Sequence, residues 1–221
     1  MATVHSETRK CPVCETVFGV DTVDSCGSHG CESDFRPHYW GPDPLEFFVH
    51  SCLECGFSGY ADNFDDGVSE VVIRKIRKFL TPRTRDLTRD SAPFFRYEFM
   101  ALIHEWEDRD SLDVADSFLR ASWVARSRKN REKERLYQRE AVRRFEEALE
   151  IGECTGQEQR AVISYLVGDL HRRLNRRRRA ETWFHRAREE HEMLGDGQHD
   201  IPSWLGDQIR RQLEAPSDLL D

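Results

Sequence analysis

Two short stretches, Cys11-Pro12-Val13-Cys14 and Cys52-Leu53-Glu54-Cys55-Gly56, decide the fold of this 221-residue chain. Each places two thiols two residues apart, so that one tight turn can aim both sulfurs, and nearby backbone N–H groups, at a single cation. Together they supply four soft ligands, the set typical of a closed tetrahedral zinc site. Gly56 permits the positive φ that such a turn often needs. The spacing predicts one structural zinc site with Cys11, Cys14, Cys52 and Cys55 as its ligands.

Two other interpretations of these cysteines are open. The four thiols could be unrelated core residues, although their paired spacing argues against this. They could also include a redox dithiol, which usually takes one Cys-x-x-Cys at the start of a helix in a thioredoxin-like βαβ setting. Neither pair is surrounded by that pattern, so zinc is the favoured interpretation.

The composition indicates a protein with wide solvated faces, because 33% of the residues are charged and only 38% are hydrophobic. Residues 1–10 are polar and lack the apolar segment of a signal peptide. No apolar run approaches the roughly 20 residues that span a membrane. We therefore expect a cytoplasmic protein without a membrane span, in a compartment where thiols stay reduced and favour metals over disulfides.

The net charge of −8 is unevenly distributed along the chain. Residues 1–66 contain twelve acidic and three basic residues, whereas the rest contains 29 acidic and 30 basic residues. Four thiolates around Zn²⁺ would add two further negative charges to the first part. Because affinity for nucleic-acid phosphates comes largely from basic side chains that release counterions, the cysteine-bearing part is poorly suited to bind nucleic acid.

Short strands are predicted around the cysteines. Residues 15–23 and 45–51 contain the β-prone residues expected of two of these strands. Residues 34–44 contain three prolines and a glycine, which predict a rigid aromatic loop without regular structure.

A further pair of thiols, Cys26 and Cys31, lies between the two main pairs. With His38 or His50 they could form a second metal site, but the ligand set is incomplete without such distant partners. The alternative is a pair of reduced thiols in a glycine-rich turn, which we favour.

The N-terminal part resembles an uncharacterised, mainly bacterial family, domain-of-unknown-function family 2225. The resemblance rests on the order Cys-Pro-x-Cys, an acidic stretch ending in Tyr, a Pro-containing stretch, and a second Cys-x-x-Cys-Gly followed by Tyr-Ala. The matching residues are Cys11, Cys14, Asp34, Tyr39, Pro44, Cys52, Cys55, Gly56, Tyr60 and Ala61. The chain departs from the pattern at residues 57–59, which separate the Gly from the Tyr-Ala, and at Cys26 and Cys31. The resemblance implies zinc and tetratricopeptide-like helices, and it implies no reaction.

Residues 68–80 form a predicted amphipathic helix with Val68, Val72, Ile76 and Phe79 or Leu80 on one face and basic residues on the other. Thr81-Pro82 is expected to end it. A basic amphipathic helix can contact a membrane or nucleic acid, but it more often packs its apolar face on a core. We favour packing.

From Pro93 onward the pattern is helical, with one long helix predicted over residues 131–151 and ended by Gly152. Residues 161–187 are similar to a tetratricopeptide repeat, since a small residue on a first helix precedes a small–large–small pattern on a second. Those residues are Gly168, Ala180, Phe184 and Ala187. A generic helical bundle is the alternative. A last helix is predicted from Pro202.

Arg172, Arg173, Arg176 and Arg177 concentrate positive charge at the turn between these two helices. They could contact an anionic partner, either a phosphate or a carboxylate-rich peptide. The alternative is a solvated turn balanced by nearby glutamates, because runs of charge are usually exposed faces.

Together these patterns predict an α+β chain. Residues 1–66 form a small zinc-ribbon-like β module, 67–92 a basic amphipathic helix and linker, and 93–221 an all-α, tetratricopeptide-like domain. The predicted function is a cytoplasmic, zinc-binding scaffold or adaptor whose helical surface binds a protein or peptide partner. A nucleic-acid-binding role for the arginine-rich patches is the alternative. An enzyme is not expected, because the sequence has no phosphate-binding loop or nucleophile elbow and four cysteines close the metal site.

Overall fold

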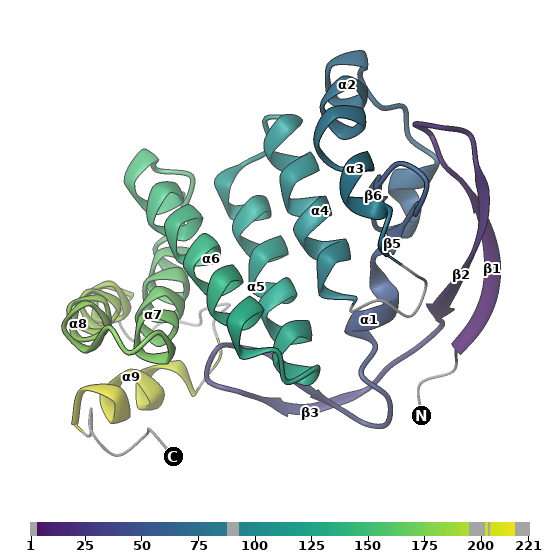
Figure 1. Ribbon diagram of the computed structural model, residues 1–221. Helices are drawn as coiled ribbons and strands as arrows, with labels where there is room; N and C mark the ends of the chain where they lie inside the picture. Colours follow the sequence, from purple (N-terminus) through teal and green to yellow (C-terminus); the bar gives the residue numbers. More distant parts are fainter. Residues whose placement is uncertain (1–3, 88–92, 195–201, 203, 215–221) are drawn as a thin grey trace.

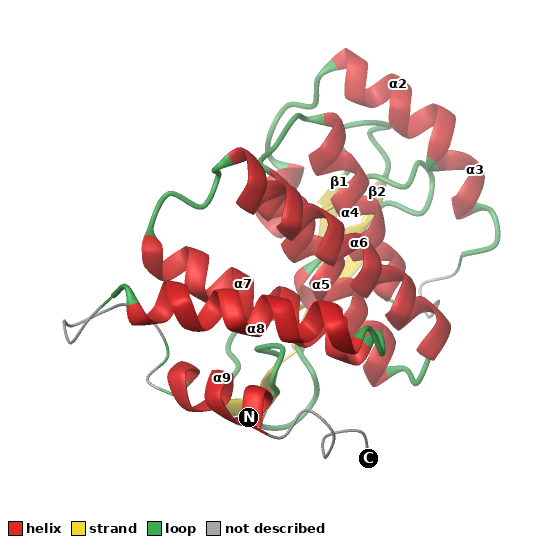
Figure 2. Ribbon diagram, turned by 90° about the vertical axis from the view of Figure 1, so that its left-hand side faces the viewer, coloured by secondary structure: helices red, strands yellow, loops and turns green. Residues whose placement is uncertain are grey.

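The computed structural model describes residues 4–87, 93–194, 202 and 204–214. Strands β1 (Val4–Lys10) and β2 (Val17–Val23) lie at one end of the molecule, and a row of helices extends away from them (Figure 1). Strand β3 (Ser28–Cys31) runs beneath these helices (Figure 1). The view turned by 90° shows helices α7 (Gln157–Arg173) and α8 (Arg177–Glu192) in front of the strands (Figure 2). The predicted α+β architecture, a small strand region that carries the cysteines followed by an all-helical part, is confirmed.

The described strands form three antiparallel two-stranded sheets rather than one continuous sheet. The pairs are β1 (Val4–Lys10) with β2 (Val17–Val23), β3 (Ser28–Cys31) with β4 (Pro37–Tyr39), and β5 (His50–Ser51) with β6 (Ser58–Gly59). The β1–β2 and β5–β6 hairpins each carry one Cys-x-x-Cys turn at the tip.

Three predictions for this region need correction. Residues 45–51 are not one strand, because helix α1 (Leu45–Phe48) precedes the short β5. Residues 34–44 are not free of regular structure, because β4 pairs with β3. Strand β1 was not predicted, since its polar sequence forms a ladder only because β2 lies beside it.

The helical part is built from one short and several long helices. Its described elements are α2 (Glu70–Phe79), α3 (Thr81–Thr84), α4 (Phe94–Trp106), α5 (Ser111–Ser127), α6 (Arg131–Ile151), α7 (Gln157–Arg173), α8 (Arg177–Glu192) and α9 (Leu205–Glu214), and a 3₁₀ turn (Ala61–Phe64) precedes them. Asn130 caps α6 by accepting a hydrogen bond from the Lys133 N–H, and Gly152 ends it at φ 81°, as predicted. None of the helices in the described residues is long and apolar enough to cross a membrane.

Helix α2 packs its apolar face on the core, as favoured from the sequence, but its details differ. It begins after Ser69, whose hydroxyl accepts a hydrogen bond from the Val72 N–H. Leu80 is fully buried whereas Phe79 is 49% exposed, so Leu80 completes the buried face. Thr81-Pro82 does not end the helical path, because α3 begins there and proline is compatible with a first helical turn.

The helix pair α7–α8 is as close as its small residues predict. A Cβ atom on Gly168 would lie 2.8 Å from the Phe184 ring, so a larger residue does not fit at this crossing. Ala180 and Ala187 are buried beside Phe184, and Leu205 of α9 joins the same cluster.

The same short turn connects three pairs of helices, α4–α5, α5–α6 and α7–α8. Each places a non-glycine residue in the left-handed region, at Asp108 (φ 54°), Lys129 (φ 56°) and Asn175 (φ 60°). In each, the N–H of the next residue donates to the carbonyl five residues earlier, for example Arg176 N to His171 O at 2.9 Å. This is a common way for a helix to end, and the same bond closes α6, from Glu153 N to Ala148 O at 3.0 Å.

Two hydrophobic clusters join the strand region to the helices. One contains Cys11, Cys52 and Cys55 together with Ile76 and Phe99, and the other contains Leu45 and Val49 together with residues of α4, α5, α6 and α7. The domain boundaries at 66 and 92 stay predictions, but the core runs across both of them.

Candidate metal centre

The four predicted ligands converge. The sulfur atoms of Cys11, Cys14, Cys52 and Cys55 all lie within 4.8 Å of one another. Cys11 Sγ lies 3.6 Å from Cys55 Sγ, and Cys14 Sγ lies 3.5 Å from Cys52 Sγ. Four sulfurs bound tetrahedrally to Zn²⁺ at about 2.3 Å would be about 3.8 Å apart. The donor set and its spacing therefore fit a single tetrahedral metal ion.

The two cysteine turns have the same backbone design. Cys11 N donates to Thr16 O and Glu15 N donates to Cys11 O, both at 2.9 Å. In the second turn, Cys52 N donates to Phe57 O at 2.9 Å and Gly56 N donates to Cys52 O at 2.7 Å. Cys11 and Cys52 make equivalent main-chain hydrogen bonds, so each turn presents its two sulfurs in the same way.

Backbone N–H groups point at the sulfurs in both turns. Val13 N lies 3.4 Å from Cys11 Sγ, and Phe57 N lies 3.4 Å from Cys55 Sγ. Such donors stabilise negative charge on sulfur, which is the form that binds a metal. The turns are therefore arranged for thiolates rather than for neutral thiols.

The left-handed residue after each second cysteine differs between the turns. Gly56 has φ 88° and Glu15 has φ 61°. The positive φ predicted for Gly56 is confirmed. Glu15 is exposed, whereas a Cβ at Gly56 would lie 2.8 Å from Leu80 Cβ. Glycine is required in the second turn by both backbone conformation and space.

The sulfurs cannot share this space as independent ionised groups. Hydrogen bonds from Cys52 and Cys55 lower the pKa of Cys11 to about 4. The hydrogen bonds to Cys11 and Cys52, together with burial, raise the pKa of Cys55. Cys11 therefore loses its proton readily, whereas Cys55 holds its proton unless a cation compensates the charge. A divalent ion bound here would supply that compensation and keep all four cysteines deprotonated.

The remaining predicted ligands do not form a comparable group. In the described part of the chain, only the four cysteines above bring three or more metal-binding side chains together. Cys26 is exposed, Cys31 is half-buried on β3, and the His38 ring lies 5.9 Å from that of His29. The structure gives the second metal site no support.

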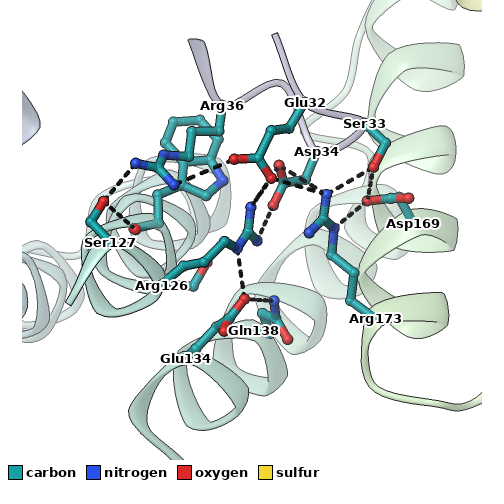
Figure 3. Close-up of polar contacts among 12 residues, drawn as sticks. Glu32, Ser33, Asp34, Arg36, Arg126, Ser127, Glu134, Gln138, Asp169 and Arg173 are labelled. Carbon is teal, nitrogen blue, oxygen red and sulfur yellow. Dashed lines mark hydrogen bonds and ion pairs between the residues drawn. The ribbon is translucent and has the colours of Figure 1, made fainter. Parts of the chain in front are cut away.

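The predicted anion-binding arginines have partners within the chain. Arg173 lies 3.4 Å from Asp34 and 2.7 Å from Asp169 (Figure 3). Arg172 also binds Asp169, at 2.7 Å. The hydroxyl of Ser33 accepts hydrogen bonds from both arginines. Two of the predicted anion contacts are thus used to hold the acidic segment around Asp34 on the helices. By contrast, Arg177 is exposed and Arg176 is half-buried at the start of α8.

Asp34 is the centre of this ion-pair network and has no exposed surface. Arg126 of α5 reaches it at 2.5 Å and also contacts Glu32 and Glu134. Burial acts to raise the pKa of Asp34, but Arg173 and Arg126 outweigh it, and the net pKa is lowered. Asp34 therefore stays ionised between two guanidinium groups from different helices.

Sequence reasoning missed the role of Asp34 and Arg126. Asp34 matches the family pattern, but nothing in the pattern indicates a partner 92 residues away. The weak available signal was the acidic excess of residues 1–66, which requires basic partners elsewhere.

Comparisons with known proteins identify a family for this chain and no individual relative. No curated protein and no solved structure matches it significantly. The family described as "Uncharacterized protein conserved in bacteria (DUF2225)" matches over residues 4–214, a span that includes both cysteine turns and the helices through α9. The chain therefore belongs to this family, as its cysteine and Asp-Tyr-Pro pattern indicated.

Proposed function

We propose that this protein is a non-enzymatic interaction protein whose N-terminal part is held together by one structural zinc ion. The observation that carries the proposal is the group of four cysteine sulfurs within 4.8 Å of one another, three of them on buried residues and one on the half-buried Cys14. Four thiolates fill a tetrahedral coordination sphere, which leaves no position for a substrate or a catalytic water. The ion would stabilise the fold rather than carry out a reaction.

Zinc is favoured over other metals by the chemistry of the ligands. Thiolates are soft donors, and a tetrahedral S₄ set is typical of zinc or iron. The two turns sit in a packed core with Phe57 and Ile76, where a redox-inactive ion serves a structural role well. A cytoplasmic setting, where thiols stay reduced, would keep the ligands available.

Metal content measured by mass spectrometry tests this part of the proposal. The wild-type chain, purified without added metal, is expected to contain one zinc per chain, and Cys52→Ser is expected to contain almost none. Cys26→Ser is the matched control, because it makes the same atomic change at an exposed thiol outside the cluster. Equal zinc in wild type and Cys52→Ser would end the assignment, and iron in place of zinc would correct the identity of the metal.

The interaction role rests on the helices. The close α7–α8 crossing at Gly168 supports stacked helical pairs of the tetratricopeptide-like kind. Stacked pairs form an extended concave surface that suits a peptide or a partner helix. A hollow of about 500 Å³ lies where α5, α6 and α7 meet the segment 35–39, and it is lined mainly by apolar residues, including Leu119 and Ile163.

A pull-down with the full chain tests this role against nucleic-acid binding. A protein partner should be retained by wild type and lost on Ile163→Asp, which places a charge in the hollow. Binding of RNA or DNA that falls steeply with salt would instead support the alternative function. In that case Arg172 and Arg173 would have to leave their carboxylate partners to reach phosphates.

A further inference from the structure

Strand β2 has one edge that no strand covers. It pairs with β1 along one side, and within the described residues no strand pairs with its other side. An uncovered edge presents a row of main-chain donors and acceptors, which is a ready template for another strand. Most proteins cover or blunt such an edge. The residues around the edge of β2 therefore indicate whether it could bind another strand.

The register identifies which residues present their main chain outward. Cys11 N donates to Thr16 O, so Cys11 and Thr16 form a hydrogen-bonded pair whose main-chain groups point at each other. In an antiparallel ladder, hydrogen-bonded and non-hydrogen-bonded pairs alternate from there. Val17 and Gly19 fall in the non-bonded pairs, opposite Lys10 and Thr8. Their N–H and C=O groups therefore point away from β1. In the described part of the chain, neither residue makes a main-chain hydrogen bond outside the β1–β2 ladder.

This edge is exposed at Val17 and Gly19 and borders a hollow. All six consecutive residues 16–21 line a hollow of about 630 Å³. Further walls come from α1, from β5 and the second cysteine turn (residues 50–54), and from Arg96 and Arg128. The hollow is therefore a groove with the free strand edge along it, in which one extended segment could lie beside β2.

The charges of the groove favour a basic segment. Its lining contains Asp21, Glu46 and Glu54 against Arg96 and Arg128, and Arg128 is already bound to Glu46 at 2.5 Å. Glu54 is exposed and forms no ion pair with a described residue. It lies between Cys52 and Cys55, whose thiolates would add negative charge at that end of the groove.

We propose that the groove beside β2 binds an extended peptide by strand addition, with the main chain of Val17 and Gly19 as its template and a Lys or Arg of the peptide beside Glu54. Main-chain hydrogen bonds give such a complex its affinity, and the flanking charges give it orientation and specificity. This site goes beyond the helical surface of the proposed function. It depends on the metal site only because the second cysteine turn forms one wall.

Selection from a displayed library of random linear heptapeptides on the immobilised, zinc-loaded full chain tests the proposal. Enriched peptides are expected to carry a basic residue, and their affinities would then be measured by fluorescence anisotropy. Gly19→Pro removes one outward N–H and no bond to β1, and proline is tolerated at a strand edge. It should weaken binding roughly tenfold, which is the effect of one lost hydrogen bond with some steric conflict. Gly19→Ala keeps the N–H and should bind within about threefold of wild type.

A second measurement acts on the peptide and does not depend on how the variant folds. N-methylation at alternate positions of a selected peptide should abolish binding, whereas methylation at the intervening positions should not, because only alternate residues face β2. No enrichment, equal binding by Gly19→Pro, or insensitivity to N-methylation would overturn the proposal. Zinc measured in the same samples separates the two ideas, since a wild-type chain that contains zinc but binds no peptide counts against the groove alone.

Discussion

The two cysteine turns have the same backbone but different surroundings. The first is followed by the exposed Glu15 and lies at the tip of the β1–β2 hairpin. The second is followed by the buried Gly56, and its Cys55 carbonyl accepts a hydrogen bond from the Thr81 hydroxyl at 2.9 Å. The two turns thus arrange their cysteines in the same way, but the second turn is also hydrogen-bonded to helix α3 through Thr81.

The attachment also differs in its chemistry. Around the second turn it is apolar, through Phe57, Ile76 and Leu80. Between the two turns, the segment around Asp34 is attached by ion pairs with Arg126 and Arg173. The comparison teaches that one part of a small metal-binding region can rest on packing while another rests on charge. The two attachments should respond differently to mutation and to pH.

The largest effect is expected from the cysteines themselves. Cys55→Ser and Cys14→Ser, at equivalent positions of the two turns, should each lose the metal and destabilise the fold by on the order of 5 kcal/mol, since metal binding and folding are linked. Cys55 is buried, so serine there also buries a hydroxyl, at a further cost of about 2 kcal/mol. Cys14 is half-buried with Thr16 Oγ1 at 3.4 Å, where serine keeps a partner. Urea unfolding followed by circular dichroism measures both, and equal midpoints would remove the asymmetry between the turns.

The ion-pair attachment should be the next most sensitive. Asp34→Asn leaves Arg126 and Arg173 without their shared carboxylate and should cost about 3 kcal/mol at pH 7. The control Glu140→Gln breaks the exposed pair with Arg143 and should cost at most about 1 kcal/mol.

The pH dependence of this variant sharpens the contrast. The pKa of Asp34 is lower in the folded than in the unfolded chain, so its stabilising contribution is fully present above about pH 4. It is lost as the pH falls from there through the folded pKa, and the difference between wild type and Asp34→Asn should shrink over that range. A difference that stays constant down to pH 3 would show that the carboxylate is not the source of the stability.

Gly56→Ala should have an intermediate effect. The φ of 88° is unfavourable for alanine, and the new Cβ would lie 2.8 Å from Leu80 Cβ. The two costs together are about 2–3 kcal/mol, without loss of a metal ligand. Thermal unfolding of the metal-loaded variant measures this, and an unchanged melting temperature would show that the chain around Leu80 can make room for the added methyl group.

Glu15→Gly should have the smallest effect. Glycine relieves the left-handed strain at φ 61°, but it loosens the unfolded chain and removes the exposed ion pair with Lys10. These contributions nearly cancel, so stability should stay within about 0.5 kcal/mol of wild type. A loss as large as that of Gly56→Ala would mean that the two turns are equally constrained.

The convergence of the four cysteines could be predicted because its signal is local. Two thiols two residues apart specify a turn whatever the rest of the chain does, and two such turns can share one cation. The long helices were predictable for a similar reason, since α6 carries its apolar period and its terminal Gly152 in the sequence. The Gly168–Phe184 crossing followed from side-chain size.

Short elements and long-range ion pairs were not predictable in this way. The β-prone sequence of residues 45–51 begins with helix α1, where burial of Leu45 and Val49 against the helices overrides local preference. The run of arginines at 172–179 suggested an external anion, but Arg172 and Arg173 meet Asp169 and the segment around Asp34. Charge alone does not identify its partner.

The sequence by itself determined the ligand set of the metal site, the α+β class and the long helices, because spacing and periodicity act over a few residues. Only the tertiary structure decided that Asp34 lies between Arg126 and Arg173 and that Leu80 packs too close to residue 56 for any side chain there. It also decided that no strand in the described residues covers the second edge of β2. These features depend on which distant segments come together when the core forms, and that outcome is set by packing over the whole chain.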